Sequence, residues 1–302
     1  MHTDRANVRL CARARGLLDE PPPYRGSRKT MKDDAFSVDH KSKTKPRSSL
    51  SHESTAIRHD FFILRFLRCC KFDVEKAKKK LENYQQLRSG TPEWFSNRDP
   101  SLPALREIFR LGVFLPLRKL DNGGRVVIII RGTVHDPRQH QMADVLKVCL
   151  MILDVAAREN VPLSLYGTSV ILDMQNATLG HALQLTPGVI KRLVHSWQGC
   201  YPIRIHSMDF INGPAYLNVV LNIFKSFMNK KLRSRVCIRK SFDDVLRDKI
   251  PIECLPLEYG GTDGSIDDLK DYWMARVEEN REWFEQDEKS MVEEKRREDE
   301  RC

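Results

Sequence analysis

The sequence has no long apolar segment of the kind that crosses a lipid bilayer. A membrane-spanning helix needs about 18 or more consecutive apolar residues, whereas apolar runs such as Val126–Ile130 have the length of a single strand. The first twenty residues also lack the apolar stretch of a secretory signal, although Arg5, Arg9, Arg13 and Arg15 leave a mitochondrial transit peptide open. We therefore expect neither a membrane-spanning nor a secreted protein.

A regular cysteine pattern is absent too. The eight cysteines contain no CxxC pair and no even spacing, which argues against a disulfide framework. We expect free thiols in a reducing cytoplasm, with Cys69 and Cys70 as small packing residues.

The motifs of common catalytic sites are missing as well. The chain contains no GxGxxG, no GxxxxGK[ST] and no GxSxG, which argues against a dinucleotide cradle, a P-loop and a nucleophile elbow. His135 and His140 lie near Asp136 without a zinc-like spacing, and nothing in the sequence supplies a third orienting group for His195 and Cys200. We expect no metal, no cofactor and no enzymatic activity.

What the sequence does contain is an excess of positive charge. Lysine and arginine number 51 against 41 aspartates and glutamates, and most of this excess lies between residues 51 and 277 rather than in the N-terminal tail alone. A basic folded surface predicts an anionic partner, either nucleic acid or a phosphoinositide or other acidic lipid headgroup. Nucleic acid is disfavoured because the chain has no recognition motif or aromatic stacking platform. A basic surface without a function is the simpler alternative.

Organisation changes along the chain. Residues 1–57 carry PPPY and a polar, basic stretch with almost no periodic apolar residues, which predicts disorder. Residues 58–98 predict a small all-α subdomain, with Asp73 as the N-cap of its second helix. Residues 105–262 alternate between strands and helices, and 263–302 predict a C-terminal helix and a charged tail, with a capping box at Ser265 and Asp268.

The central part has the pattern of an α/β fold. Buried strands are expected at 125–130, 168–173 and 203–211, with a shorter one at 236–238, and helices at 140–158 and after Thr186-Pro187. We expect an α/β/α sandwich with a mixed, mainly parallel sheet. Asp173, at the end of a predicted strand, could be a catalytic acid or a capping group.

One predicted helix, 213–228, is unusual. No charged residue occurs from Pro214 to Phe224, and basic residues follow immediately from Lys225 onward. A helix that is apolar almost all round either is central to the core or faces something other than water. Followed by a basic collar, it also fits a surface that docks on an anionic bilayer.

Five segments in order resemble the CRAL-TRIO lipid-binding family, in particular its tocopherol-transfer and retinaldehyde-binding branch. They are DFFILRFLRCCKFDVEKA, VVIIIRG, VILDM, YPIRIHSMDFINGP and LPLEYGG. The resemblance covers roughly residues 58–290. The resemblance implies a helical lid, a sandwich that encloses an apolar cavity, and a mobile gate helix matching 213–228. It further implies a non-enzymatic carrier of one hydrophobic lipid.

The resemblance and the apolar periodicity together indicate which residues line the pocket. Candidate pocket residues come from one helix and from later strands and helices: Leu146, Cys149, Leu150, Leu153, Leu172, Leu193, Trp197, Tyr201, Ile203, Met208 and Phe210. The alternative for each is ordinary core packing. The candidate gate residues are Tyr216, Leu217, Val220, Leu221, Ile223 and Phe224.

The resemblance also implies a basic cleft beside the gate that binds phosphatidylinositol bisphosphate. Its positions fall on Lys79, Arg204, His206, Lys231 and Arg235, and His206 stands where the family has an arginine. A second family arginine is replaced by Cys70, with Lys71 adjacent. We expect a site of altered or weaker affinity.

The pocket departs from the family's tocopherol-binding pattern. Cys149 and Leu153 match two serines that border tocopherol, and Ala177 matches a pocket tryptophan. Another terpenoid, a retinoid, a carotenoid or a phospholipid therefore remains open as the ligand.

Two functions follow from the sequence. The first is a cytoplasmic lipid carrier, transiently peripheral on endosomal or other phosphoinositide-bearing membranes. The second is a lipid-sensing regulatory or membrane-recruitment adaptor that performs no net transfer.

Overall fold

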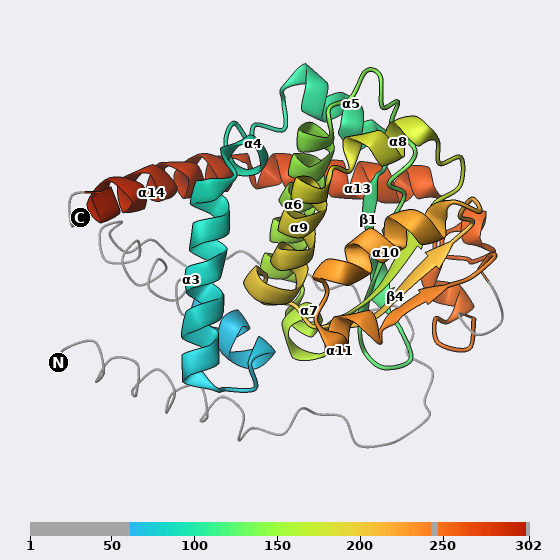
Figure 1. Cartoon of the computed structure of the whole chain (residues 1–302), viewed down its shortest axis with the longest axis horizontal. Coiled ribbons are helices and arrows are strands. Elements are labelled where there is room, and N and C mark those ends of the chain that lie inside the picture. The colour runs from blue at the N-terminus through green and yellow to red at the C-terminus, as the bar shows by residue number, and fades with distance from the viewer. Residues whose placement is uncertain (1–60, 243–246, 300–302) are drawn as a thin grey trace, which may run out of the picture. The chain divides into compact units, whose positions relative to one another are not determined.

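The computed structural model describes residues 61–242 and 247–299, and their side chains up to residue 293 (Figure 1). The chain divides into two compact units, Met1–Arg65 and Phe66–Cys302, and the fold below is that of the second unit. The predicted disordered segment 1–57 lies outside the described residues.

Helices precede the sheet. Residues 61–69 are helical, and α3 (Val74–Gly90) begins after Asp73, whose side chain accepts a hydrogen bond from the Lys76 amide as an N-cap. Two shorter helices follow, α4 (Pro92–Phe95) and α5 (Pro103–Leu111). Gly112, with a φ of 65°, ends α5 and turns the chain into the first strand.

The sheet has five strands in the order β1-β2-β3-β4-β5. β1 (Phe114–Leu120) is antiparallel to β2 (Val126–Ile130), and β3 (Thr168–Asp173), β4 (Ile205–Ile211) and β5 (Val236–Ile238) continue the sheet in parallel. The expected α/β fold with a mixed, mainly parallel sheet and flanking helices is therefore confirmed. The strand expected at 203–211 begins two residues later, at Ile205.

β1 is a strand that the sequence did not reveal. Pro116 lies inside it, and Arg118 and Lys119 break its apolar pattern, so its last residues are exposed and its register with β2 shifts. The turn between the two strands is held by Asp121, whose carboxylate accepts hydrogen bonds from the amides of Gly123 and Arg125 at 2.8 and 2.9 Å. An edge strand tolerates proline because one side of its ladder has no strand partner.

Helices and short turns fill the connections between strands and the C-terminal part. In chain order they are α6 (Met142–Glu159), α7 (Val161–Leu165), α8 (Leu179–Gln184), α9 (Pro187–His195), α10 (Leu217–Phe227), α11 (Lys230–Arg233), 3-10 turns at Ile252–Cys254 and Leu257–Tyr259, α13 (Ile266–Glu279) and α14 (Arg281–Asp299).

Three helices differ from their expected bounds. α6 extends from Met142 to Glu159 rather than over 140–158. α9 continues as a π-helical turn, Ser196–Cys200, which the sequence did not predict. The expected helix 213–228 consists of α10 alone, because Met228 is extended and Asn229 caps a separate helix, α11, by accepting a hydrogen bond from the Leu232 amide at 2.8 Å. The basic residues after α10 therefore lie on α11 rather than on a continuation of the same helix.

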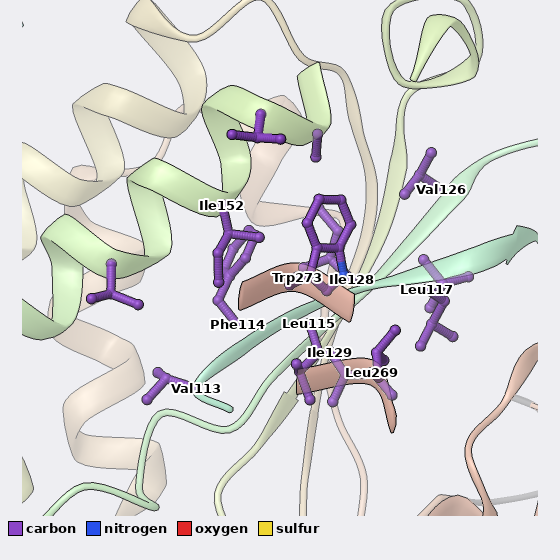
Figure 2. Close-up of a cluster of buried hydrophobic side chains, with 14 of the residues drawn as sticks. Val113, Phe114, Leu115, Leu117, Val126, Ile128, Ile129, Ile152, Leu269 and Trp273 are labelled. Carbon is purple, nitrogen blue, oxygen red and sulfur yellow. The ribbon is translucent and has the colours of Figure 1, made fainter. Parts of the chain in front are cut away.

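The main core lies between β1, β2, α5, α6 and α13. Figure 2 shows Leu269 and Trp273 of α13 beside side chains of β1 and β2, such as Leu115 and Ile129. The Trp273 indole donates a hydrogen bond of 2.7 Å to the backbone oxygen of Pro116, and the expected capping box at Ser265 begins α13. The helix that follows the sheet in sequence is thus anchored to its antiparallel edge.

Candidate functional site

An apolar cavity of about 200 Å³ borders one face of the sheet. The strand register places side chains in two rows on this face: Ile128, Val170 and Met208 in one, and Ile130, Leu172 and Phe210 in the next. All six line the cavity. Because side chains alternate across a strand, the parallel register alone produces this apolar floor.

Helices form the other walls. α6 contributes Leu146, Cys149, Leu150 and Leu153, while the end of α9 and the segment that follows it contribute Leu193, Trp197, Tyr201 and Ile203. The eleven pocket residues indicated by the sequence thus all lie on the wall of one cavity. Residues that the sequence analysis missed include Val145, Thr133, Ser196 and Leu185, which carry no signal beyond ordinary apolar or loop patterning.

The polar side chains of the wall are largely paired within the protein. The hydroxyls of Thr133, Thr168 and Ser196 each donate to a backbone oxygen, at 2.6, 2.8 and 2.7 Å, and both ring nitrogens of His181 have hydrogen-bond partners. The buried Tyr201 hydroxyl has no such partner in the described part of the chain. No Asp, Glu, Lys or Arg is among the described residues that line the cavity.

Burial keeps the Cys149 thiol and the Tyr201 hydroxyl of this wall neutral. It raises the pKa of the Cys149 thiol to about 12, and it raises that of the Tyr201 hydroxyl well above its usual range. The cavity therefore offers an uncharged, apolar environment that suits the hydrocarbon part of a ligand.

One face of α10 lines the cavity. Leu217, Val220, Leu221 and Phe224 line the wall, and the Phe224 ring stacks on Trp197 with centroids 5.9 Å apart and planes 7° apart. The structure does not place the other two expected gate residues on the wall. The Tyr216 hydroxyl donates a 2.8 Å hydrogen bond to the Ala177 backbone oxygen, and Ile223 is 38% exposed.

The outer surface here is unusually apolar. Val219 on α10 is 65% exposed, and Leu179 and Leu183 on α8 are 68% and 77% exposed. Leu179 and Leu183 lie one helical turn apart and therefore share a face. The hydrogen bond from Tyr216 to Ala177 joins the segment before α10 to the segment before α8, so the two helices begin close to each other.

A basic cleft of about 780 Å³ lies beside the cavity. The five basic residues that the resemblance indicated, Lys79, Arg204, His206, Lys231 and Arg235, all line it. Three lysines that the sequence analysis did not assign to the cleft also line it: Lys71, Lys76 and Lys80. No carboxylate is among the described residues of its wall.

Helical spacing explains most of the missed lysines. Lys76, Lys79 and Lys80 stand at i, i+3 and i+4 on α3 and so share one face, whereas Lys78 does not line the cleft. Lys71 reaches the cleft because it and Phe72 take left-handed backbone conformations, with φ of 55° and 62°, in the turn before α3.

Three cations of the cleft donate hydrogen bonds to backbone oxygens, which fixes the positions of their side chains. Arg204 donates to the Leu165 oxygen and Arg235 to the Ile205 oxygen, while Lys80 donates to Gln198 at 3.1 Å. Burial, followed by the nearby charges of Arg125, Arg235 and Arg204, lowers the pKa of His206 from its usual 6.5. The imidazole is therefore neutral at pH 7.

One short segment connects the cleft to the cavity. Trp197, Ile203 and Ile205 line both. Next to Trp197, the Gln198 side chain donates to the Phe227 oxygen at 3.1 Å and accepts from the Asn229 amide at 2.9 Å. The π-helical turn thus contacts the cleft through Lys80 and the end of α10 through Gln198.

The remaining candidates of the sequence have structural contacts. Asp173 accepts hydrogen bonds from the Tyr259 hydroxyl at 2.7 Å and from the side-chain amide of Asn212 at 2.9 Å. It also accepts one from the backbone amide of Gln175 at 3.0 Å, which makes it a loop-capping group. His135 pairs with Gln184 at 2.9 Å. Within residues 61–242 and 247–299, no cluster of three or more His, Cys, Asp or Glu side chains could hold a metal ion, and no helix is long and apolar enough to cross a membrane.

Known proteins resemble this chain over most of its length. Residues 111–261 match the family model of the CRAL/TRIO domain, and residues 56–105 match that of the Pinta-like UBA domain. Alpha-tocopherol transfer protein-like of Mus musculus is 30% identical over 258 residues, which cover 85% of this chain and 71% of that protein.

One further relative is covered less fully, and one solved structure shows a weaker similarity. Clavesin-1 of Xenopus laevis is 30% identical over 203 residues, 67% of this chain and 61% of that protein, so the chain spans less than two thirds of that relative's length. The crystal structure of Sfh5 is similar with a TM-score of 0.49 at 13% identity, over 70% of this chain and 75% of that one.

Proposed function

We propose that this chain, which belongs to the CRAL/TRIO domain family, is a lipid carrier. It would enclose one hydrophobic lipid and exchange it at phosphoinositide-containing membranes. In this proposal it has no enzymatic activity and needs no resident metal or cofactor. The observation that carries the proposal is the uncharged cavity that α10 lines beside a cleft of basic residues.

The cavity supports the binding of an uncharged lipid body. Withdrawing a lipid from a bilayer costs about 0.8 kcal/mol for each CH₂, and a wall without charged side chains can offset this cost. A dry apolar cavity of about 150 Å³ already binds benzene, so the cavity of about 200 Å³ has room for a ring system before any movement of α10. Tocopherol-, retinoid- and other terpenoid-like molecules have this chemistry.

The outer surface supports docking on an anionic membrane. The exposed side chains of α8 and α10 provide an apolar contact, and basic residues near an anionic surface contribute about 1 kcal/mol each. Lys79, Arg204, Lys231 and Arg235 would together contribute on the order of 4 kcal/mol. That is enough for reversible docking when it is combined with the apolar contact.

The π-helical turn supports a link between headgroup binding and opening. A phosphate in the cleft would compete with the Gln198 oxygen for the Lys80 ammonium, and Gln198 also holds the C-terminal end of α10. We infer that a headgroup loosens this end of α10 and that Phe224 then separates from Trp197. The protein would act in the cytoplasm, transiently on endosomal or other phosphoinositide-bearing membranes.

The assignment of the cavity as a lipid-binding site is tested by identifying the molecule that the purified protein contains. Protein purified from its own cells is extracted with organic solvent, and native mass spectrometry compares intact and extracted protein. We expect one neutral hydrophobic molecule per chain in the wild type and a large loss of it in Leu153→Trp, which fills the wall. The matched variant Val292→Trp, on a position of α14 that is 66% exposed and does not line the cavity, should keep the ligand; equal retention in both variants would overturn the assignment of the cavity.

The cleft is tested by transfer between vesicles. Lys231→Glu combined with Arg235→Glu should slow transfer to vesicles that contain phosphatidylinositol bisphosphate while leaving the ligand bound. Arg110→Glu combined with Lys289→Glu makes the same change in net charge on exposed positions that do not line the cleft. An unchanged rate in the cleft variant would show that the cleft is misassigned.

The alternative function, a lipid-sensing adaptor, is separated by the same assay. An adaptor would bind ligand and vesicles but would move no ligand from donor to acceptor vesicles.

A further inference from the structure

Two adjacent cysteines lie on the wall of the basic cleft, and the proposed carrier function uses neither. The helix over residues 61–69 ends at Cys69, and the left-handed turn at Lys71 and Phe72 follows directly. This turn is closed by hydrogen bonds from the Phe72 amide to the Leu67 oxygen and from the Asp73 amide to the Cys70 oxygen, at 2.7 and 3.2 Å. Cys69 and Cys70 are both partly exposed and both line the cleft, so they are not simply packing residues.

The surroundings of Cys69 favour its thiolate. The hydrogen bond from the Cys70 thiol, together with the charges of Lys80, Arg204 and Lys231, outweighs burial and lowers the pKa of Cys69 to about 7. The same hydrogen bond raises the pKa of Cys70, which therefore stays protonated and able to donate.

Other cysteines of the chain are in the opposite situation. Burial raises the pKa of Cys149 to about 12 and that of Cys200 to about 11. Because the thiolate is the nucleophile, Cys69 is the one of these three thiols that can react at neutral pH. Its position in a cleft without carboxylates also selects the charge of the reagent, because cations attract an anionic disulfide and repel a cationic one.

We propose that Cys69 is a covalent modification site that forms a mixed disulfide with a small anionic disulfide of the oxidised-glutathione type, whose carboxylates the basic side chains of the cleft bind. The Cys69 thiolate attacks one sulfur of the reagent, and a new sulfur–sulfur bond forms as the old one breaks. The leaving half departs as a thiolate and takes a proton from water. Cys69 is oxidised and the departing half is reduced, so the reagent itself supplies the oxidising equivalents.

This modification would have a consequence that rests on the proposed function. The attached peptide carries carboxylates into the space that a phosphorylated headgroup would occupy, between α3 and the residues Lys231 and Arg235. It would therefore neutralise part of the positive charge and block the cleft. We expect the modified protein to bind phosphoinositide vesicles about tenfold more weakly, the equivalent of one to two lost basic contacts.

The site is tested by the rate of modification of the full chain. Wild-type protein and the variants Cys69→Ser, Cys70→Ala and Cys237→Ser are treated with oxidised glutathione at pH 7.4, and intact mass spectrometry follows the addition. Cys237 is an exposed thiol that does not line the cleft, so its variant controls for simple accessibility. We expect the fast phase to vanish in Cys69→Ser, to slow several-fold in Cys70→Ala, and to persist in Cys237→Ser.

The electrostatic part is tested with a second reagent on the wild-type chain, which avoids any effect of a substitution on folding. Cystamine is a disulfide of similar reactivity that carries positive charge. Oxidised glutathione should modify the protein about tenfold faster than cystamine, and Lys231→Glu combined with Arg235→Glu should remove this preference. The rate should rise as the pH increases through about 7 and level off above it.

Two outcomes would overturn the proposal: a fast phase that survives in Cys69→Ser, or a wild-type preference for cystamine. The consequence is judged separately by vesicle binding of the modified protein. If Cys69 is modified as expected but vesicle binding is unchanged, the modification site stands and the assignment of the cleft to phosphoinositide fails.

Discussion

At the scale of single residues, the guanidinium of Arg98 stabilises the contact between the first helices and the rest of the fold. Its side chain has no exposed surface, and it pairs with Asp154 of α6 at 2.9 Å and with Asp287 of α14. The rings of Phe95, Trp283 and Phe284 surround it within 6.0 Å. Because an unpaired buried charge would lower the stability of the fold, the two ion pairs of Arg98 favour one arrangement of α6 and α14.

Replacing Arg98 by alanine should therefore destabilise the protein strongly. Removing one partner of a buried ion pair leaves an uncompensated charge and typically costs 3–5 kcal/mol. We expect a loss of about that size in the free energy of unfolding, measured by urea denaturation. Arg281→Ala removes a pair between Arg281 and Asp99 in which Arg281 is half exposed, and it should cost less than about 1 kcal/mol.

His206 makes the cleft sensitive to acid. The pKa of His206 is lower in the folded protein than its usual 6.5. As the pH falls below about 6.5, the unfolded chain therefore binds a proton more readily than the folded protein. The folded state is then less stable than it is near pH 7, where the ring is neutral. A bound phosphate would favour the protonated ring. We expect vesicle affinity of the wild type to exceed that of His206→Gln about fivefold at pH 5.5, the effect of one added charge, and to equal it at pH 7.5. Equal affinities at both pH values would place His206 outside the binding surface.

At the scale of elements, α8 and α10 expose apolar side chains that packing does not explain. Leu183→Ser combined with Val219→Ser should reduce binding to anionic vesicles on the order of tenfold, because each change removes apolar surface worth about 0.8 kcal/mol per CH₂ from the contact. The melting temperature should hardly change, since both side chains are mainly exposed. Val292→Ser, 66% exposed on α14 far from α8 and α10 (Figure 1), is the matched control and should bind normally.

The π-helical turn is the second element with a predicted role. Gln198→Ala removes both side-chain hydrogen bonds that hold the end of α10, at a cost of about 1–3 kcal/mol to the closed state. We expect spontaneous ligand release to become several-fold faster, as measured by transfer of a fluorescent hydrophobic ligand to neutral vesicles. Gln286→Ala, exposed on α14, should leave release unchanged; identical rates in both variants would show that Gln198 does not restrain α10.

At the scale of the whole molecule, the parallel arrangement of β2, β3 and β4 brings the two sites together. Each crossover returns the chain to the end of the sheet at which the parallel strands begin. Residues far apart in sequence therefore lie side by side on one face, as Ile128 does with Val170 and Val170 with Met208. The apolar cavity and the basic cleft then share Trp197, Ile203 and Ile205. In the proposed function, this proximity would let binding of a headgroup in the cleft affect closure of the cavity.

The local signals of the sequence were sufficient for the elements that follow simple rules. Asp73, Thr186 and Ser265 each begin a helix as their capping chemistry predicts, and the apolar runs at β2 and β3 form buried strands. β1 was missed because Pro116 and two basic residues obscure its alternation. The π-helical turn has no sequence signature, and the side chains that bond to its backbone oxygens, Lys80 and Asn83, come from α3, which is distant in sequence.

The sequence by itself determined several helix caps, the buried strands β2 and β3, the absence of charge from Pro214 to Phe224 and the surplus of lysine and arginine, because capping, periodicity and charge are properties of residues close together in the chain. The tertiary structure alone decided that Lys71, Lys76 and Lys80 join the cleft, that Tyr216 contacts Ala177 rather than the cavity, and that Cys69 lies among cations. These facts depend on contacts between segments distant in sequence. Only the position of Lys71 also depends on the left-handed turn at Lys71 and Phe72.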